Sequence, residues 1–188
     1  MVAQPKTPTF TVAEYLAMEE AGDIKYEYVD GYIYAMAGGT PAHAAVGGNA
    51  VTALNTALRQ SPCIVYNSDV RLQLSPTHYV HPDATVSCDE RDRASAREKY
   101  IHYPSLVVEA LSDSTEANDR GEKLLAYSAI ETIMDYLLVN YRRRLVERYQ
   151  RHADGIWTYH RFGAGDRIPL PALGIQLEVD DFYLKIDL

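Results

Sequence analysis

Long hydrophobic runs are absent from this sequence, and so are the many cysteines that a disulfide network requires. No apolar stretch approaches the roughly 20 residues of a membrane-spanning helix. The opening residues, MVAQPKTPTFTVAEY, lack the basic-then-apolar order of a secretory signal. Cys63 and Cys88 are too few for a disulfide framework and lie in no zinc-binding pattern. We therefore expect a protein of the cytoplasm, a reducing compartment, with no membrane partner.

Positive charge is also scarce, because 18 lysines and arginines face 26 aspartates and glutamates, a formal net charge of -8. A protein that only coats nucleic acid needs a positive surface, so this balance disfavours that class. It does not exclude an enzyme that gathers carboxylates around metal ions, because the metal then supplies the positive charge. The 188 residues, 47% of them hydrophobic, suit one globular domain over residues 1–188.

Local patterns predict helices and strands in a mixed order. Thr11 and Glu14 have the spacing of a helix capping box, and Asp30-Gly31 between two tyrosine-rich halves indicates a β-hairpin. Pro41 suits the first turn of a second helix. The segments that we expect are helices over residues 12–21, 41–60 and 118–129, the last capped by Asn118 or Asp119; strands over 63–74, 79–87, 106–111 and 133–140; and further β-structure after residue 140.

This order predicts an α/β or α+β fold with one mixed central sheet flanked by helices. The core would span about residues 41–140, with an N-terminal helix and hairpin over 10–37 and a C-terminal β extension over 141–188 outside it. The last strand-helix-strand unit of the core should cross over right-handed, which makes its two strands parallel.

Glu109 interrupts the apolar run SLVVEAL and shares a strand face with Val107 and Leu111, so alternation does not turn it towards water. A buried carboxylate needs a partner. Asp83 lies near the start of the preceding strand and Glu109 towards the end of its own. If the two strands pair antiparallel, both acids meet at one sheet edge. Two like charges would repel there unless they share a divalent cation, and their hard oxygen ligands suit Mg²⁺ or Mn²⁺.

Lys123 lies about one turn inside the helix that follows Glu109, at a distance its ammonium can bridge. Two acids, a metal and a lysine suit phosphodiester hydrolysis. The metal would polarise the phosphate and lower the pKa of its water, while the lysine would orient that water or stabilise the developing charge.

At these residues the chain resembles a bacterial family of restriction-endonuclease-like proteins within the PD-(D/E)XK nuclease superfamily. The similarity runs from about residue 10 to 146 and rests on the order and spacing of four motifs, YEYVDGYIY, VHPDATV, PSLVVEALSDST and NDRGEKLLAYS. It implies a restriction-endonuclease-like core whose order, helix, three strands, helix, strand, agrees with the periodicity.

The resemblance also implies site residues. Asp83 and Glu109 would be the two metal-binding acids, with the backbone carbonyl of Ala110 as a further ligand, and Lys123 would replace the lysine usually found where Leu111 stands. Glu27 matches an acid of the N-terminal motif. His43 matches a histidine that often opens the following helix and would play a supporting part. Tyr32 stands where the family often has another acid, which leaves the number of metal ions open.

Simpler interpretations compete for several residues. Glu109 could pair with an arginine such as Arg71, and Asp119 is more typical of a helix cap than of a ligand. The basic cluster Arg142, Arg143, Arg144, Arg148 and Arg151 suggests DNA binding, but we favour an exposed hairpin whose arginines pair with acids. The alternating tyrosines of the N-terminal hairpin suggest a packed face or a dimer interface. We expect a homodimer joined through this hairpin and the C-terminal strands.

The leading hypothesis is a Mg²⁺-dependent or Mn²⁺-dependent endonuclease that acts on DNA. The rival is a non-catalytic accessory module that binds DNA or a protein on the same scaffold. A third option is a carboxylate-pair hydrolase without metal, for instance on a glycoside.

Overall fold

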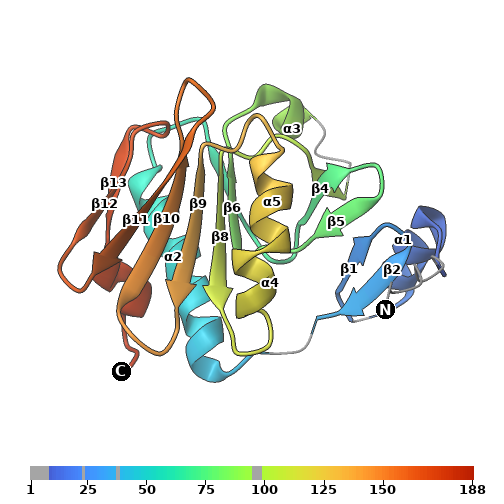
Figure 1. The fold of residues 1–188 in the computed structure, drawn as a ribbon, viewed down its shortest axis with the longest axis horizontal. Helices are drawn as coiled ribbons and strands as arrows, with labels where there is room; N and C mark the ends of the chain where they lie inside the picture. Colours follow the sequence, from blue (N-terminus) through green and yellow to red (C-terminus); the bar gives the residue numbers. More distant parts are fainter. Residues whose placement is uncertain (1–8, 23, 37–38, 95–98) are drawn as a thin grey trace, which may run out of the picture.

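The computed structural model describes residues 9–22, 24–36, 39–94 and 99–188, and its described strands divide among three sheets (Figure 1). Our expectation about the opening residues falls largely on 1–8, outside this part of the chain. The central sheet has six strands in the order β11-β10-β9-β8-β6-β3. These strands are β3 (Ile64–Asn67), β6 (Ala84–Ser87), β8 (Leu106–Leu111), β9 (Asp135–Asn140), β10 (Leu145–Arg151) and β11 (Trp157–Gly163).

The central sheet is mixed, as the sequence predicts. Strand β6 pairs antiparallel with β8, and β8 pairs parallel with β9. The connection between the parallel strands carries α4 (Glu116–Arg120) and α5 (Glu122–Ser128) instead of one helix over 118–129, because the chain breaks at Gly121. Its φ of -114° and ψ of -96° are not helical.

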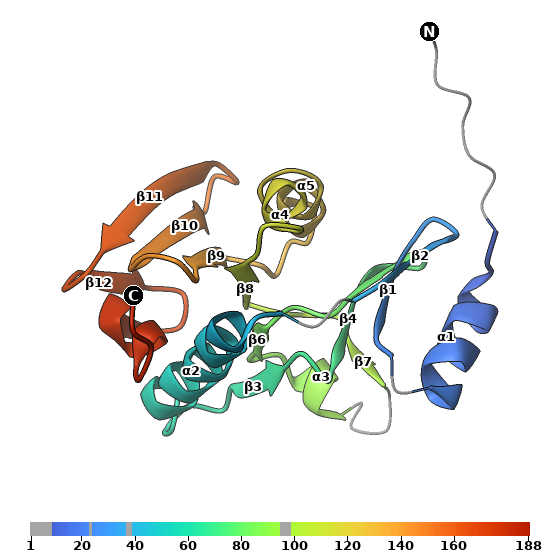
Figure 2. The ribbon, with the colours of Figure 1, turned by 90° about the horizontal axis from the view of Figure 1, so that it is seen from below.

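Helices cover both faces of the central sheet (Figure 2). On one face, α2 (Pro41–Ala57) packs beside the hairpin of β12 (Arg167–Leu170) and β13 (Ile175–Glu178) and the 3-10 helix η1 (Val179–Tyr183). Helices α4 and α5 cover the other face. Strand β8 alternates between the two cores, since Val108 and Ala110 join the α2 side and Val107 and Leu111 join Tyr127 on the α5 side.

A second sheet holds the N-terminal hairpin. Its order is β2-β1-β5-β4-β7, from β1 (Tyr26–Val29), β2 (Tyr32–Ala35), β4 (Arg71–Ser75), β5 (His78–Val80) and β7 (Tyr100–Ile101). The turn lies at Asp30-Gly31, whose φ values of 47° and 92° fit the hairpin that this dipeptide predicts. Helix α1 (Val12–Ala21) begins at the predicted capping box and packs on this sheet through the Tyr15, Tyr28 and Tyr79 cluster.

Two predicted strands are each divided between the sheets. The segment 63–74 turns after Asn67, where the Asn67 carbonyl accepts from the Val70 amide at 3.2 Å, so β3 lies in the central sheet and β4 in the second. The segment 79–87 breaks at His81–Pro82–Asp83 between β5 and β6. Because of these breaks, the prediction of a single sheet was wrong. The N-terminal hairpin is hydrogen-bonded to β5, and β10 and β11 extend the central sheet, whereas β12 and β13 form a two-stranded sheet of their own.

The basic cluster after β9 mostly pairs with acids, as we favoured. Arg142 contacts Asp113, and Arg144 lies 2.7 Å from Asp180. Arg148 is not exposed, since only 2% of it is accessible and it pairs with the buried Asp135 at 2.7 Å.

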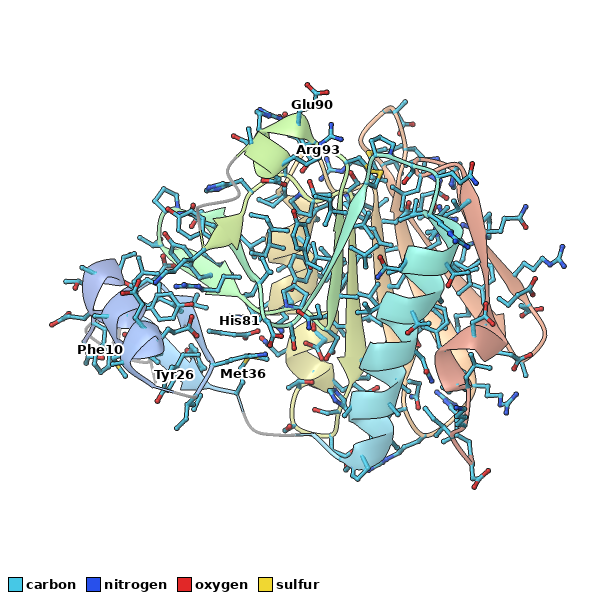
Figure 3. The ribbon with its side chains drawn as sticks, turned by 180° about the vertical axis from the view of Figure 1, so that it is seen from behind. Phe10, Tyr26, Met36, His81, Glu90 and Arg93 are labelled. Carbon is cyan, nitrogen blue, oxygen red and sulfur yellow. A yellow bond between two sulfur atoms is a disulfide. The ribbon has the colours of Figure 1, made fainter. Side chains whose placement is uncertain are left out.

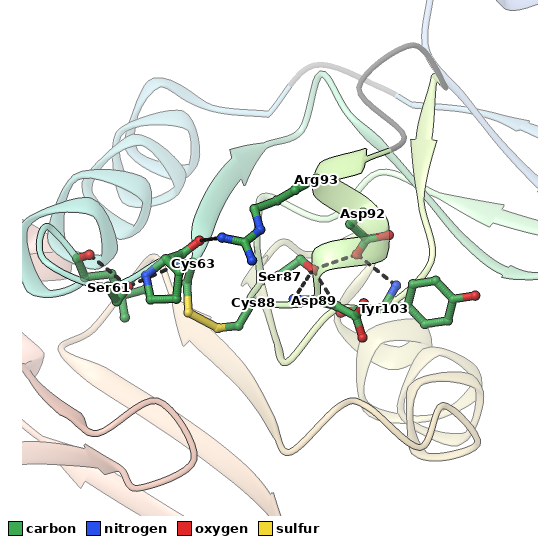
Figure 4. Close-up of a disulfide and its surroundings, with 10 residues drawn as sticks. Ser61, Cys63, Ser87, Cys88, Asp89, Asp92, Arg93 and Tyr103 are labelled. Carbon is green, nitrogen blue, oxygen red and sulfur yellow. Dashed lines mark hydrogen bonds between the residues drawn. A yellow bond between two sulfur atoms is a disulfide. The ribbon is translucent and has the colours of Figure 1, made fainter.

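The two cysteines form a disulfide (Figure 4). Cys63 directly precedes β3 and Cys88 directly follows β6. Because Ile64 pairs with Ser87 at the end of this antiparallel ladder, the two cysteines face each other as the next pair. The expectation of reduced cysteines was wrong, because the spacing of 25 residues hides a cross-strand pair that only the β3–β6 register creates. Across the described ranges, no helix has both the length and the apolar character needed to cross a membrane.

Candidate active site

Glu109 finds its partners on α5. The ammonium of Lys123 donates to Glu109 Oε1 at 3.0 Å, and the hydroxyl of Tyr127 donates to the same oxygen at 2.7 Å. Exposure is 5% for Glu109, 7% for Lys123 and 0% for Tyr127. The proposed pairing with Arg71 does not form, because Arg71 lies at 3.2 Å from Glu19 instead. The apolar run therefore holds an acidic residue whose partners, an ammonium and a hydroxyl, come from the next helix.

Two further carboxylates converge on Lys123. Glu27, from β1, lies with its Oε1 at 2.8 Å from the ammonium, and Asp119, from α4, lies with its Oδ1 at 3.6 Å. The expectation of Asp119 as a helix cap was wrong, because α4 begins at Glu116 with Thr115 in the cap position. Asp119 is instead only 1% exposed and lies one turn before Lys123 on the same side.

Asp83 reaches the end of β8 from the α2 side. Its Oδ2 accepts the backbone N–H of Ala110 at 2.8 Å, and a Cβ on Gly47 of α2 would come within 3.4 Å of its Oδ1. His43, in the first turn of α2, places Nε2 at 2.7 Å from the Ala110 carbonyl oxygen and at 3.9 Å from Asp83 Oδ2. Asp83 thus contacts the backbone of Ala110, the residue after Glu109, while the Glu109 side chain points to α5 and Asp83 lies against α2.

A family model described as "Uma2: Putative restriction endonuclease" matches residues 12–180 of this chain. The chain belongs to the Uma2 family.

Relatives of this Uma2 protein cover nearly all of its length. The uncharacterized protein slr1290 of Synechocystis sp. is 40% identical over 177 residues, which are 94% of this chain and 92% of the relative. A second uncharacterized Synechocystis protein, sll1609, is 30% identical over 187 residues, 99% of this chain and 100% of the relative.

The fold has a solved counterpart. A crystal structure from Anabaena variabilis, titled as a "putative nuclease belonging to DUF820", superposes with a TM-score of 0.77 at 17% identity, covering 95% of this chain and 99% of that one. The restriction-endonuclease-like fold expected from the motifs is therefore confirmed.

Carboxyl groups outnumber cations in the candidate site. Glu27, Glu109 and Asp119 all lie within 3.6 Å of the Lys123 ammonium, and Asp83 lies beside the Ala110 backbone. Burial raises the pKa of Glu109 to about 8; the charge of Lys123 works against the rise, and the neighbouring carboxylates add to it. Burial also raises the pKa of Asp83 and of Asp119. Burial alone would lower the pKa of Lys123, but the charges of Glu109, Glu27 and Asp119 hold it above its usual value. The site without metal therefore retains a proton on a carboxyl and would accept further positive charge.

The donors of the site fit a hard divalent cation in kind and in charge. In the described part of the chain, no group of three or more His, Cys, Asp and Glu side chains is arranged to hold a metal. Mg²⁺ does not require such a cage, since it keeps several waters and is commonly bound by one or two carboxylates. Glu27 Oε1 and Asp119 Oδ1 are buried and lie beside the same ammonium of Lys123, at 2.8 Å and 3.6 Å, which is consistent with a deficit of positive charge.

Sequence reasoning missed Tyr127 and misread Asp119, although a signal for both was present. Each lies four residues from Lys123, so the three share one side of a helical path in NDRGEKLLAYS. The fold brings together Glu27, Glu109 and Lys123 as direct contacts, with Asp83, His43 and the Ala110 backbone forming a second contacting group at the same strand end. Their catalytic roles stay predictions.

Proposed function

We propose that this protein is a metal-dependent phosphodiesterase that cuts DNA as an endonuclease. The observation that carries the proposal is the cluster at the end of β8, where buried acids from β1, β8 and α4 surround one lysine and Asp83 adjoins them. Membership of a family described as restriction endonucleases and a fold shared with a protein titled as a nuclease support it.

In this proposal, Asp83, Glu109 and the carbonyl of Ala110 hold one Mg²⁺ or Mn²⁺. The bound ion would polarise the phosphate and supply a water of lowered pKa. Lys123 contributes a fixed ammonium that orients the attacking water or stabilises the charge that develops on the phosphate. Glu27 holds that ammonium at 2.8 Å, and His43 steadies the Ala110 carbonyl at 2.7 Å.

The DNA backbone has a candidate path beside the site. A cavity of about 280 Å³ lies at the ends of β8 and β9, lined by Leu111, Tyr141 and Arg143 among others. The ring of Tyr141 meets that of His43 edge-on, with centroids 6.3 Å apart, so one wall of the cavity contacts His43. Arg143 is exposed there, and we propose that its guanidinium contacts a phosphate.

The test compares metal binding and cleavage. Mn²⁺ is titrated calorimetrically, and supercoiled plasmid and single-stranded RNA are offered as substrates, to the wild type and to Asp83→Asn, Glu109→Gln and Lys123→Met. Asp69→Asn, at an exposed pair with Lys25, serves as the matched control. We expect both acid variants to lose Mn²⁺ binding and cleavage, and Lys123→Met to lose cleavage while it still binds Mn²⁺. A wild type that binds no Mn²⁺ and cuts neither substrate would contradict the proposal.

One observation favours the rival, a non-catalytic accessory module. Glu109 and Lys123 are almost fully buried and satisfy each other, so neither presents an atom to a substrate in this conformation. That module would bind DNA or a partner protein with no turnover at any Mn²⁺ concentration, and with an affinity unaffected by Asp83→Asn.

Two finer points also belong to the proposal. We place the enzyme in the cytoplasm, where DNA is available, although the Cys63–Cys88 disulfide is atypical of a reducing compartment. We also propose a homodimer through β2, which is an edge strand with Tyr34 55% and Met36 36% exposed beside it. A monomer in sedimentation at micromolar concentration would contradict the dimer.

A further inference from the structure

Glu19, on α1, is a buried carboxylate outside the cluster described above. Its Oε1 accepts the backbone N–H of Tyr26 at 2.7 Å and lies 3.1 Å from Nε2 of His81. Its Oε2 lies 3.2 Å from Nε of Arg71, and the side chain is only 8% exposed. One carboxylate therefore contacts three segments that are distant in sequence.

Two of these segments carry the candidate acids. Tyr26 directly precedes Glu27, and His81 lies two residues before Asp83. The ladder between β1 and β5 ends at the pair Tyr28 with Tyr79, so it stops before it reaches Glu27. Continued in the same register, the ladder would place Tyr26 opposite His81, and there Glu19 Oε1 contacts both residues. Figure 3 shows His81 between the N-terminal helix and hairpin on one side and the central strands on the other.

The bridge is anchored from both sides. His81 is 3% exposed, and its Nδ1 lies 3.0 Å from the carbonyl oxygen of Ser68, while Arg71 is 6% exposed. Burial acts to raise the pKa of Glu19, but the hydrogen bonds from His81 and Tyr26 and the charges of His81 and Arg71 together lower it below its usual value. Glu19 is therefore an ionised group whose position is set by partners on two strands.

We infer that Glu19 is a positioning residue of the active site, which sets the separation of Glu27 from Asp83 through Tyr26 and His81. This inference rests on the proposed nuclease function. Glu27 in turn holds the Lys123 ammonium, so a shift of β1 would move the ammonium relative to Asp83 and Glu109. A misplacement of about 1 Å at a catalytic group can cost on the order of a hundredfold in rate.

The experiment compares Glu19→Ala and Glu19→Gln with Glu20→Ala. Glu20 is the next residue of α1 and forms an exposed pair with Lys99, so it controls for the loss of an acid from this helix. Plasmid cleavage and Mn²⁺ affinity are measured at a temperature where circular dichroism shows each variant folded. We expect Glu19→Ala to lower kcat at least tenfold with little change in KM, and Glu20→Ala to match the wild type. Glu19→Gln keeps an acceptor for the Tyr26 amide and should recover part of the loss.

A second comparison separates positioning from general destabilisation. If Glu19 acts through Glu27, then Glu19→Gln should change kcat little further once Glu27→Gln is present. A wild type that neither binds Mn²⁺ nor cleaves would refute the nuclease function itself. An active wild type in which the folded Glu19→Gln and Glu20→Ala proteins have equal kcat, or in which the Glu19 and Glu27 effects simply multiply, would overturn the inference.

Discussion

Replacing Lys123 by methionine should strongly destabilise the metal-free protein. Methionine keeps the length of the side chain and removes the ammonium that lies 2.8 Å from Glu27 and 3.0 Å from Glu109. At an effective dielectric constant of about 20, a contact of this length between the ammonium and an ionised carboxylate is worth about 6 kcal/mol; for Glu109, whose pKa is about 8, this applies only once the carboxyl has ionised. Desolvation of the buried ammonium offsets several kcal/mol of this, and breaking a buried ion pair costs about 3–5 kcal/mol net.

Urea unfolding followed by circular dichroism measures this loss. With a slope of about 2 kcal/mol per molar urea, the midpoint should fall by about 2 M. Lys25→Met is the matched control, because its ammonium pairs with Asp69 at 2.6 Å on the surface, where such pairs contribute at most about 1 kcal/mol. A divalent cation would replace the lost charge, so Mn²⁺ should raise the midpoint more in Lys123→Met than in the wild type. Equal midpoints for the two lysine variants without metal would refute the role of Lys123 as counter-ion.

Three further predictions follow from other parts of the structure. The pKa of Glu109 is raised from 4.5 to about 8 in the folded protein, so the folded state binds this proton more tightly and the metal-free protein loses stability as pH rises between these values. The stability of Glu109→Gln relative to the wild type should therefore grow by up to about 1.4 kcal/mol per pH unit in this range. A difference that stays constant with pH would contradict the raised pKa. The disulfide closes a loop of 25 residues, so replacing Cys63 and Cys88 by serine should lower the free energy of unfolding in urea by about 3 kcal/mol. An unchanged midpoint under oxidising conditions would show that the bond does not form. Arg143→Ala should weaken DNA binding, measured by fluorescence anisotropy, and reduce the dependence of log K on log salt concentration by about one. Arg59→Ala, just beyond the end of α2 that is far from His43, should change neither quantity. Equal effects of the two substitutions would show that Arg143 does not contact a phosphate.

Local chemistry predicted much of the scaffold. The capping box of Thr11 and Glu14 and the turn at Asp30-Gly31 are short-range rules, and both appear in the structure where the sequence places them. The alternation of β8 put Glu109 on the face of Val107 and Leu111, which is where it lies. Each of these features depends on residues only a few positions apart, so a short segment of sequence is enough to predict it.

Pairings between distant segments were beyond such rules. The breaks after Asn67 and before Asp83 divide two continuous β patterns between sheets, because the hydrogen-bonding partners of β4 and β5 come from the N-terminal hairpin and from β7. The Cys63–Cys88 bond depends on the same long-range register.

Two parts of the site can be read from short segments alone, because SLVVEAL places a carboxylate at the fourth position of an apolar strand and NDRGEKLLAYS places a lysine on the helix that follows. The acid that completes the surroundings of this lysine could be found only from the packing of distant segments, because Glu27 reaches the ammonium from β1, whose position no local pattern specifies. The free-energy cost of burying the Glu109 carboxyl can be recognised from its own strand, but the groups that offset this cost are brought to it by the packing of the whole chain.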